Sequence, residues 1–259
     1  MTQLHKMSTL IYILLATFLG SIVSLAGGII LLSREKFMLK ISHFLASFAA
    51  GVLLGAAFFD LLPEALHVAE SSKTNIHVWT LIGILLFFIL ERFIHWFHHH
   101  EKHDEHLKES RSTVPLIIIS DTVHNFLDGA IIAATFLTSV PLGIIATLAV
   151  ITHEIPQEIG DFGLLLSKGM PKNKIIIVNV ISAAVAFAGA LLTYLFGNFL
   201  ENYIAIFLAL TAGFFIYIAT SDLIPEINYE RRRGYAIIES FLLIFGIVVI
   251  FLSVSLIDH

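Results

Sequence analysis

Residues 141–167 read PLGIIATLAVITHEIPQEIGDFGLLLS, an apolar run with acidic and imidazole side chains near its middle. The run exceeds the ~20 residues that an α-helix needs to cross a bilayer. His153, Glu154 and Glu158 fall well inside it. Because a charged side chain at that depth costs about 3 kcal/mol or more, it normally faces the interior of a helix bundle. The stretch therefore predicts a membrane helix whose polar face meets other helices.

The composition extends this prediction to the whole chain. Hydrophobic residues make up 57% of the 259 residues and charged residues 14%, whereas a soluble domain carries about 25% charged residues. The sequence has no Cys, so any metal site must use nitrogen and oxygen ligands. The apolar run at 10–32 is too long for the core of a signal peptide and is about the length of a membrane span. We therefore expect a polytopic membrane protein with no nucleic-acid partner.

Eight stretches are apolar and long enough to span a bilayer, which predicts an all-α fold and one membrane domain over residues 1–259. Their expected bounds are 8–32, 42–69, 76–97, 114–138, 141–167, 174–198, 202–228 and 234–257. The basic residues support this division, because all but Lys6 and Lys73 fall in alternate loops. Loops rich in Lys and Arg face the cytoplasm. Both termini are therefore expected outside.

The sequence also repeats itself. The segment from Ala50 to Glu64, ending DLLPE, returns as the segment from Ala212 to Glu226, ending DLIPE, at a constant offset. The first copy is expected to run outward and the second inward. A weaker pair is formed by HNFLD, from His124, and HEIPQ, from His153. Inverted repeats of this kind are typical of transporters, with the substrate site near the bilayer midplane between the repeats.

Polar residues gather in the fourth and fifth spans. His124 and Asp128 are four residues apart and therefore share one helix face. In the fifth span, His153 and Gln157 form one pair at the same spacing, and Glu154 and Glu158 form another. The polar residues of the two spans are Asp121, His124, Asn125, Asp128, His153, Glu154, Gln157, Glu158 and Asp161. Buried polar residues can link helices by hydrogen bonds alone. So many carboxylates need a cation to offset their repulsion, which favours a metal or proton pathway.

Pro156 lies inside this fifth-span cluster. A proline has no N–H, so the carbonyl of Thr152 loses its helical partner and the helix is expected to bend there. A bend would widen the interior and offer a backbone oxygen to a cation.

Two other functions must be weighed. HEIPQ, from His153, is one residue from the HExxH motif of zinc proteases, and Leu127-Asp128-Gly129 matches the LDG of intramembrane ones. Gln157 is a poor zinc ligand, however, and the LDG precedes the HExxQ rather than following it.

A proton-coupled carrier of small organic solutes would need a basic residue in the membrane, and the basic residues fall in or beside loops. We therefore expect a transporter rather than an enzyme.

The same two motifs carry a family resemblance. HNFLDG, His124–Gly129, and HEIPQEIGD, His153–Asp161, resemble the fourth- and fifth-helix motifs of the ZIP (Zrt/Irt-like) metal transporters, nearest to the branch with HEXPHEXGD. The resemblance covers essentially the whole chain. It implies import of a divalent cation into the cytoplasm through a two-metal centre between the fourth and fifth helices. The chain departs from the pattern at Gln157, where that branch has His, which bears on how many ions bind and which.

The resemblance carries a ligand set over to this chain: His124, Asn125, Asp128, His153, Glu154, the Gln157 position and Glu158. Imidazole with carboxylate suits Zn²⁺, Fe²⁺ or Mn²⁺, and the metal is expected as substrate with no catalytic cofactor. The expected partners are divalent ions, Zn²⁺ first and Cd²⁺ among the others, and the lipid bilayer, with a homodimer left open. The expected location is the plasma membrane, with the chain crossing it several times.

Further residues are candidates for the pathway or its surroundings. Six His lie in HWFHHHEKHDEH, residues 95–106, and the expected cytoplasmic loop at 98–111 is a candidate metal buffer or sensor. Its candidate ligands are His98, His99, His100, His103 and His106. The other candidates are polar residues at the ends or on the inner faces of the spans: Asp60, Glu64, His67, Asp121, Asp161, Asn179, Asp222 and Glu226. For Asn179 we expect a hydrogen bond between helices rather than a ligand.

Overall fold

The computed structural model describes residues 3–70, 74–96, 114–200, 203–228 and 234–257. Within these ranges the chain is helical and forms no strand. The elements are α1 (Gln3–Ala56), the π-helix η1 (Ala57–Leu61), α2 (Leu62–Ala69), α3 (Ile76–Trp96), α5 (Val114–Thr138), α6 (Val140–Ser167), α7 (Lys172–Leu195), α8 (Gly197–Leu200), α9 (Ile204–Tyr217), the π-helix η4 (Ile218–Leu223), α10 (Ile224–Asn228) and α11 (Tyr235–Ile257). The all-α prediction is confirmed.

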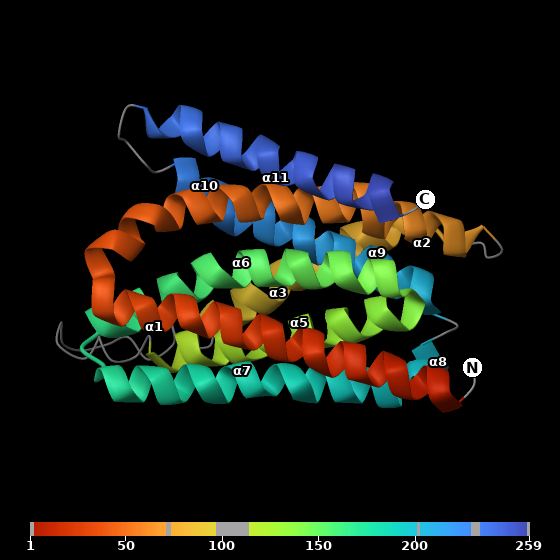
Figure 1. Ribbon diagram of the computed structural model, residues 1–259, viewed down its shortest axis with the longest axis horizontal. Helices are drawn as coiled ribbons and strands as arrows, with labels where there is room; N and C mark the ends of the chain where they lie inside the picture. The colour runs from red at the N-terminus through yellow and green to blue at the C-terminus, as the bar shows by residue number, and fades with distance from the viewer. Residues whose placement is uncertain (1–2, 71–73, 97–113, 201–202, 229–233, 258–259) are drawn as a thin grey trace.

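In the described ranges, eight helical segments are long and apolar enough to cross a membrane. They run over Ser8–Arg34, His43–Ala69, Ile76–Phe93, Ile117–Thr138, Val140–Leu166, Lys172–Leu195, Ile204–Leu223 and Tyr235–Leu256. These bounds agree with the expected spans to within a few residues. Figure 1 shows the long helices lying side by side, with both chain ends at the same end of the molecule. An even number of spans requires that arrangement.

The first two spans are joined differently from the sequence prediction. Instead of a loop, the chain stays helical from Gln3 to Ala56, with one break at Arg34, where φ is −135° and ψ is 48°. A single residue with a non-helical backbone is therefore enough to turn the chain back across the molecule.

The repeated DLLPE and DLIPE segments have the same unusual backbone. Each begins inside a π-helix, with Asp60 and Leu61 in η1 and Asp222 and Leu223 in η4. The N–H of Leu62 donates to the carbonyl of Ala57, and the N–H of Ile224 donates to that of Ala219, one residue further back than in an α-helix. Pro63 and Pro225 follow directly and cannot donate a backbone hydrogen bond. The repeat is thus a repeat of structure as well as of sequence, and π-helical turns are frequent at functional sites.

Glycines bring pairs of long helices into backbone contact. A Cβ added at Gly129 on α5 would overlap the carbonyl oxygen of Ala186 on α7, and one at Gly189 on α7 would overlap that of Phe126. Small residues allow this approach in membrane bundles. Reciprocal contacts of the same kind join α1 to α11 and α3 to α9 through Gly51 and Gly246, and through Gly83 and Gly213.

The glycine contacts divide the spans into two sets. Gly28, on the first span of α1, lies against Phe162 of α6, and Gly143 of α6 lies against Phe136 of α5. We call the first span of α1 with α5, α6 and α7 the first helix group. The second span of α1 with α3, α9 and α11 is the second helix group. Each glycine contact between spans that the structure describes falls within one of these groups.

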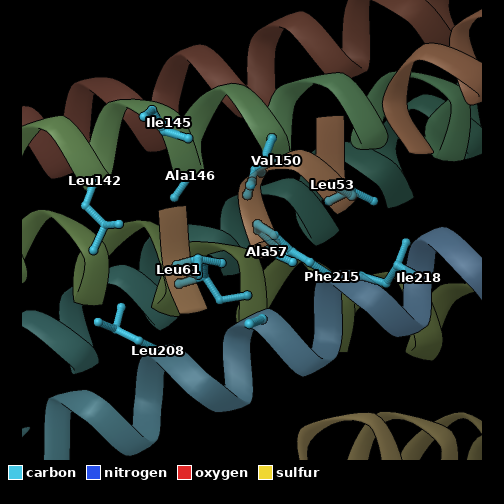
Figure 2. Packing of buried hydrophobic residues seen from close by; sticks show 14 of the residues in the cluster. Leu53, Ala57, Leu61, Leu142, Ile145, Ala146, Val150, Leu208, Phe215 and Ile218 are labelled. Carbon is cyan, nitrogen blue, oxygen red and sulfur yellow. The ribbon is translucent and has the colours of Figure 1, made fainter. Parts of the chain in front are cut away.

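The surface between the groups is packed by branched side chains instead. Figure 2 shows Leu53, Ala57 and Leu61 meeting side chains from α6 and from α9 with η4. The residues that α6, α9 and η4 contribute there are Leu142, Ile145, Ala146, Val150, Leu208, Phe215 and Ile218. The two groups therefore share one apolar core, and the glycine contacts among the described residues lie within each group rather than between them.

The helix that carries the opening stretch has a defined start. The Ser139 hydroxyl oxygen accepts a hydrogen bond from the N–H of Leu142 at 3.3 Å, and Pro141 lies in the first turn, where its missing N–H is harmless. From there α6 continues as one helix through Pro156 to Ser167. One residue, Ser139, separates α5 from α6, so the two helices run antiparallel with their polar faces together.

Candidate metal centre

Four side chains from α5 and α6 converge on one point. His124, Asp128, His153 and Glu154 each offer a ligand atom, and these four atoms lie within 4.8 Å of one another. All four side chains are buried, with exposed fractions of 8%, 4%, 1% and 3%. The weaker sequence repeat is what meets here, because HNFLD and HEIPQ supply two residues each.

The distances between these atoms approach those of a tetrahedral site. The two Nε2 atoms are 3.0 Å apart. His124 Nε2 lies 3.4 Å from Glu154 Oε1, and His153 Nε2 lies 3.4 Å from Asp128 Oδ2, so each imidazole approaches the carboxylate of the other helix. Within each helix the corresponding distances are 3.8 and 4.0 Å. Tetrahedral zinc with ligands at about 2.0–2.1 Å would place its ligand atoms about 3.3–3.4 Å apart.

The tautomer of His153 is fixed by the backbone. Its Nδ1–H donates to the carbonyl of Ala149 at 2.9 Å. The Nε2 atom therefore keeps its lone pair and faces His124. A hydrogen bond of this kind orients a metal-ligating imidazole and increases its basicity.

The carboxylates of the four convergent residues each have a buried oxygen facing no hydrogen-bond donor of acceptable geometry in the described part of the chain. Asp128 Oδ2 and Glu154 Oε1 have no hydrogen-bond partner of acceptable geometry among the described residues. Burying a carboxylate oxygen without compensation is costly. A divalent cation between the two imidazoles and the two carboxylates would supply that compensation.

Asn125 lies beside this group, as its motif position predicts. Its amide nitrogen donates to Asp121 Oδ1 at 2.8 Å and to the Asp121 carbonyl at 3.1 Å, and it lies 3.4 Å from Ser182 Oγ. These bonds hold the nitrogen and leave the amide oxygen as the atom able to bind a cation. Asn125, Asp128 and Glu154 together line a narrow cavity.

The other wall of that cavity comes from helices that sequence reasoning did not connect with the site. The first span of α1 contributes Thr17, Gly20, Ser21 and Ser24, and α7 contributes Ala186. Thr17 Oγ1 is buried and has no hydrogen-bond partner within the described residues. The spacing of Thr17, Ser21 and Ser24 places three hydroxyls on one helix face, which is the signal that could have indicated this wall.

Two aromatic rings from the second helix group lie against the imidazoles of the centre. Phe87 of α3 lies edge-on to His124, with ring centroids 5.8 Å apart, and Phe215 of α9 lies 6.2 Å from His153. Phe87 in turn packs on Phe214 and Tyr217. The four convergent ligand atoms belong to the first helix group. Phe87 and Phe215 of the second helix group lie against the two imidazoles.

The remaining motif residues fall at different places. Gln157 is half-buried one turn beyond His153, and Glu158 is buried one turn beyond Glu154; neither is among the four convergent residues. Asp121 is buried and Asp161 is half-buried, both further along the two polar faces. Asn179 is buried on α7, and its amide donates to the carbonyl of Ile175 at 2.8 Å within the same helix. That hydrogen bond is not the one between helices that the sequence suggested.

The candidate entrance and exit residues are not among the four convergent residues. Asp60 of η1 and Glu64 of α2 are half-buried, His67 of α2 is exposed, and Asp222 of η4 is exposed. Glu226 belongs to α10. Figure 1 shows α2 at the end that holds both termini and α10 at the opposite end. The loop candidates His98, His99, His100, His103 and His106 lie outside the described residues.

The chain is similar in sequence to known proteins. The family model for the ZIP zinc transporter matches residues 7–115 and 98–253. The chain belongs to the ZIP zinc transporter family. It is accordingly a multi-pass membrane protein.

Individual relatives in the ZIP family differ in how much they share with the chain. Zinc transporter ZIP13 of Pongo abelii is 31% identical over 229 residues, which are 83% of this chain and 67% of that protein. Zinc transporter ZIP10 of Danio rerio is 33% identical over 165 residues, covering 60% of this chain and 20% of that protein. Metal cation symporter ZIP14 of Danio rerio is 40% identical over 119 residues, covering 46% of this chain and 24% of that protein. The chain thus spans about a fifth of the length of its ZIP10 and ZIP6 relatives.

Proposed function

We propose that this protein moves a divalent metal cation across a membrane, and that His124, Asp128, His153 and Glu154 bind the cation during transit. The observation that carries the proposal is the convergence of two imidazole nitrogens and two unpartnered carboxylate oxygens in a buried site between α5 and α6. The relatives' names, zinc transporter and metal cation symporter, point the same way. Asn125 would add an amide oxygen from the cavity wall, and Gln157 remains a candidate for a second ion.

The donor set favours Zn²⁺ among the available metals, with Fe²⁺, Mn²⁺ and Cd²⁺ as alternatives. Two imidazoles and two carboxylates match the nitrogen and oxygen ligands of zinc. Mg²⁺ prefers oxygen ligands and retains several waters, which two imidazoles disfavour. The near-tetrahedral spacing of the donor atoms supports the same preference.

The mechanism that we propose is alternating access by movement of one helix group against the other. The described ligand atoms belong to α5 and α6 of the first helix group, which glycine contacts join closely. The second helix group contributes the rings of Phe87 and Phe215 and an apolar packing surface. A movement between the groups would therefore uncover the cation from one side while leaving its ligands together.

The direction of transport is proposed from the resemblance of the motifs, and the orientation of the chain from the distribution of charge. The alternate loops that contain most of the basic residues are expected to face the cytoplasm. We propose uptake into the cytoplasm across the plasma membrane, with Asp60, Glu64 and His67 toward the outer entrance. Asp222 and Glu226 would then lie toward the inner exit.

The test is metal uptake by the purified full chain in liposomes, over a panel of Zn²⁺, Cd²⁺, Fe²⁺, Mn²⁺ and Mg²⁺. His124→Ala and Glu154→Ala each remove one of the four ligands, and we expect either change to lower Zn²⁺ uptake at least tenfold. Each variant should still elute as a single folded species.

A matched control is Thr74→Ala, outside the four convergent residues and in the turn before α3. It should leave uptake unchanged. Wild-type uptake by both ligand variants, at equal protein density in the liposomes, would contradict the proposed site.

A further inference from the structure

We propose that Asp121, Glu158 and Asp161 form a second cation-binding position, built from oxygen ligands alone and separate from the four-residue centre. The proposal rests on the proposed function, because the second position would receive the cation that the first releases. It gives a role to three carboxylates that the four-residue centre does not use.

The position follows from helix geometry. Asp121 precedes His124 by three residues on α5, a rise of about 4.5 Å, and Asp161 follows Glu154 by seven residues on α6, a rise of about 10 Å. Because the helices are antiparallel, both displacements point toward the same end of the molecule. Glu158 lies one turn beyond Glu154 and, counted from the turn at Ser139, reaches nearly the same depth as Asp121.

The three carboxylates continue the polar faces that carry the centre. Asp121 lies one turn before His124 on α5, and Glu158 and Asp161 lie one and two turns after Glu154 on α6. Asp121 is held in place by the amide of Asn125, which also lines the cavity beside the first centre. The two positions are thus linked through one side chain.

Glu158 provides the independent sign of a ligand. Its side chain is 1% exposed, and both of its carboxylate oxygens lack a hydrogen-bond partner among the described residues. Neither α5 nor α6 contains a Lys or Arg that could neutralise it. A buried carboxylate without a hydrogen bond or a counter-charge is strongly destabilising, whereas a bound cation compensates for it.

The chemistry of this position differs from that of the first centre. It offers carboxylate oxygens and no imidazole. Compared with the first centre, it therefore suits harder cations such as Mn²⁺ better and binds Zn²⁺ less tightly. A zinc ion moving inward would exchange two imidazoles for oxygen ligands. That exchange weakens its binding as it leaves and lowers the barrier to release.

The experiment counts Mn²⁺ and Zn²⁺ ions bound to the purified full chain in lipid nanodiscs by equilibrium dialysis and elemental analysis. Wild type should bind two Mn²⁺ ions. The double variant Asp121→Asn with Asp161→Asn should bind one Mn²⁺ and retain one tightly bound Zn²⁺, which shows that the His centre is intact. His153→Ala should do the reverse, retaining an Mn²⁺ ion while losing tight Zn²⁺ binding. Glu91→Gln, which changes a carboxylate outside both positions, is the matched control and should keep two Mn²⁺ ions.

Other results would overturn the second position. Two Mn²⁺ ions in the double Asn variant would place the second ion at a two-metal centre with the histidines instead. Loss of Zn²⁺ together with Mn²⁺ in that variant would show that the three carboxylates belong to the first centre. If wild type binds a single ion and His153→Ala alone removes it, the second position does not exist, whereas the proposed function is unaffected. Absence of metal binding by wild type would contradict the proposed function itself.

Discussion

At the scale of single residues, Gln157 distinguishes this chain from the HEXPHEXGD pattern. It lies one turn beyond His153 on α6 and is half-buried. Its amide oxygen is a neutral and weak ligand. Replacing Gln157 with His should strengthen Zn²⁺ binding relative to Mn²⁺ binding, because imidazole favours zinc over manganese. We expect the ratio of apparent Zn²⁺ to Mn²⁺ affinities to rise about tenfold, which corresponds to about 1.4 kcal/mol.

The measurement is paired Zn²⁺ and Mn²⁺ uptake by wild type and Gln157→His in the same liposome preparation. Tighter binding slows release, so the maximal Zn²⁺ rate should fall while the apparent affinity rises. Gln157→Asn is the control, since it keeps the amide but shortens its reach. An unchanged Zn²⁺/Mn²⁺ ratio in the His variant would show that position 157 does not face the cation.

At the scale of helices, the contact between α5 and α7 positions one half of the centre. Gly129 directly follows the ligand Asp128 and lies against the carbonyl of Ala186, with no space for a Cβ. Gly129→Leu should push the two helices apart, displace Asp128 and destabilise the fold by about 1–3 kcal/mol, as overpacking does. We expect a lower thermal unfolding temperature and weaker Zn²⁺ binding, both measured on the purified protein.

Gly160 provides the matched control on the neighbouring helix. A Cβ at Gly160 meets nothing within 4 Å. Gly160→Ala should therefore keep both the unfolding temperature and Zn²⁺ binding, or raise the former slightly, because Ala favours a helix by about 1 kcal/mol over Gly. Equal behaviour of the two variants would mean that the glycine contact does not position Asp128.

At the scale of the whole molecule, the orientation in the membrane is open to a direct test. The chain has no Cys, so a single Cys can be introduced and labelled with a thiol reagent that does not cross membranes. Asn75, before α3, and Asn173, at the start of α7, are both exposed. Because the basic loops are expected inside, Asn75→Cys should react in intact cells and Asn173→Cys only after the membrane is permeabilised.

The unlabelled wild type and a metal-uptake assay of each Cys variant serve as controls for this test. Labelling of Asn173→Cys in intact cells, with Asn75→Cys protected, would reverse the orientation and with it the proposed direction of transport.

The sequence by itself predicted a membrane environment, the bounds of the spans and a set of seven candidate ligands that includes the four convergent residues. Hydropathy and helix periodicity are properties of neighbouring residues, so span bounds and polar faces follow from them without any long-range contact. The tertiary structure decided which polar residues meet. It brought His124 and His153 together at 3.0 Å, because antiparallel packing aligns residues by their distance from Ser139.

Contacts between distant segments also set the features that the sequence left open. The hydroxyls of Thr17, Ser21 and Ser24 became part of the cavity wall only because α1 packs beside α5 and α6. The pairing of Gly129 with Ala186, and with it the division into two helix groups, depends on which helices are neighbours in space. Periodicity cannot indicate that, because a small residue permits a close approach without specifying its partner.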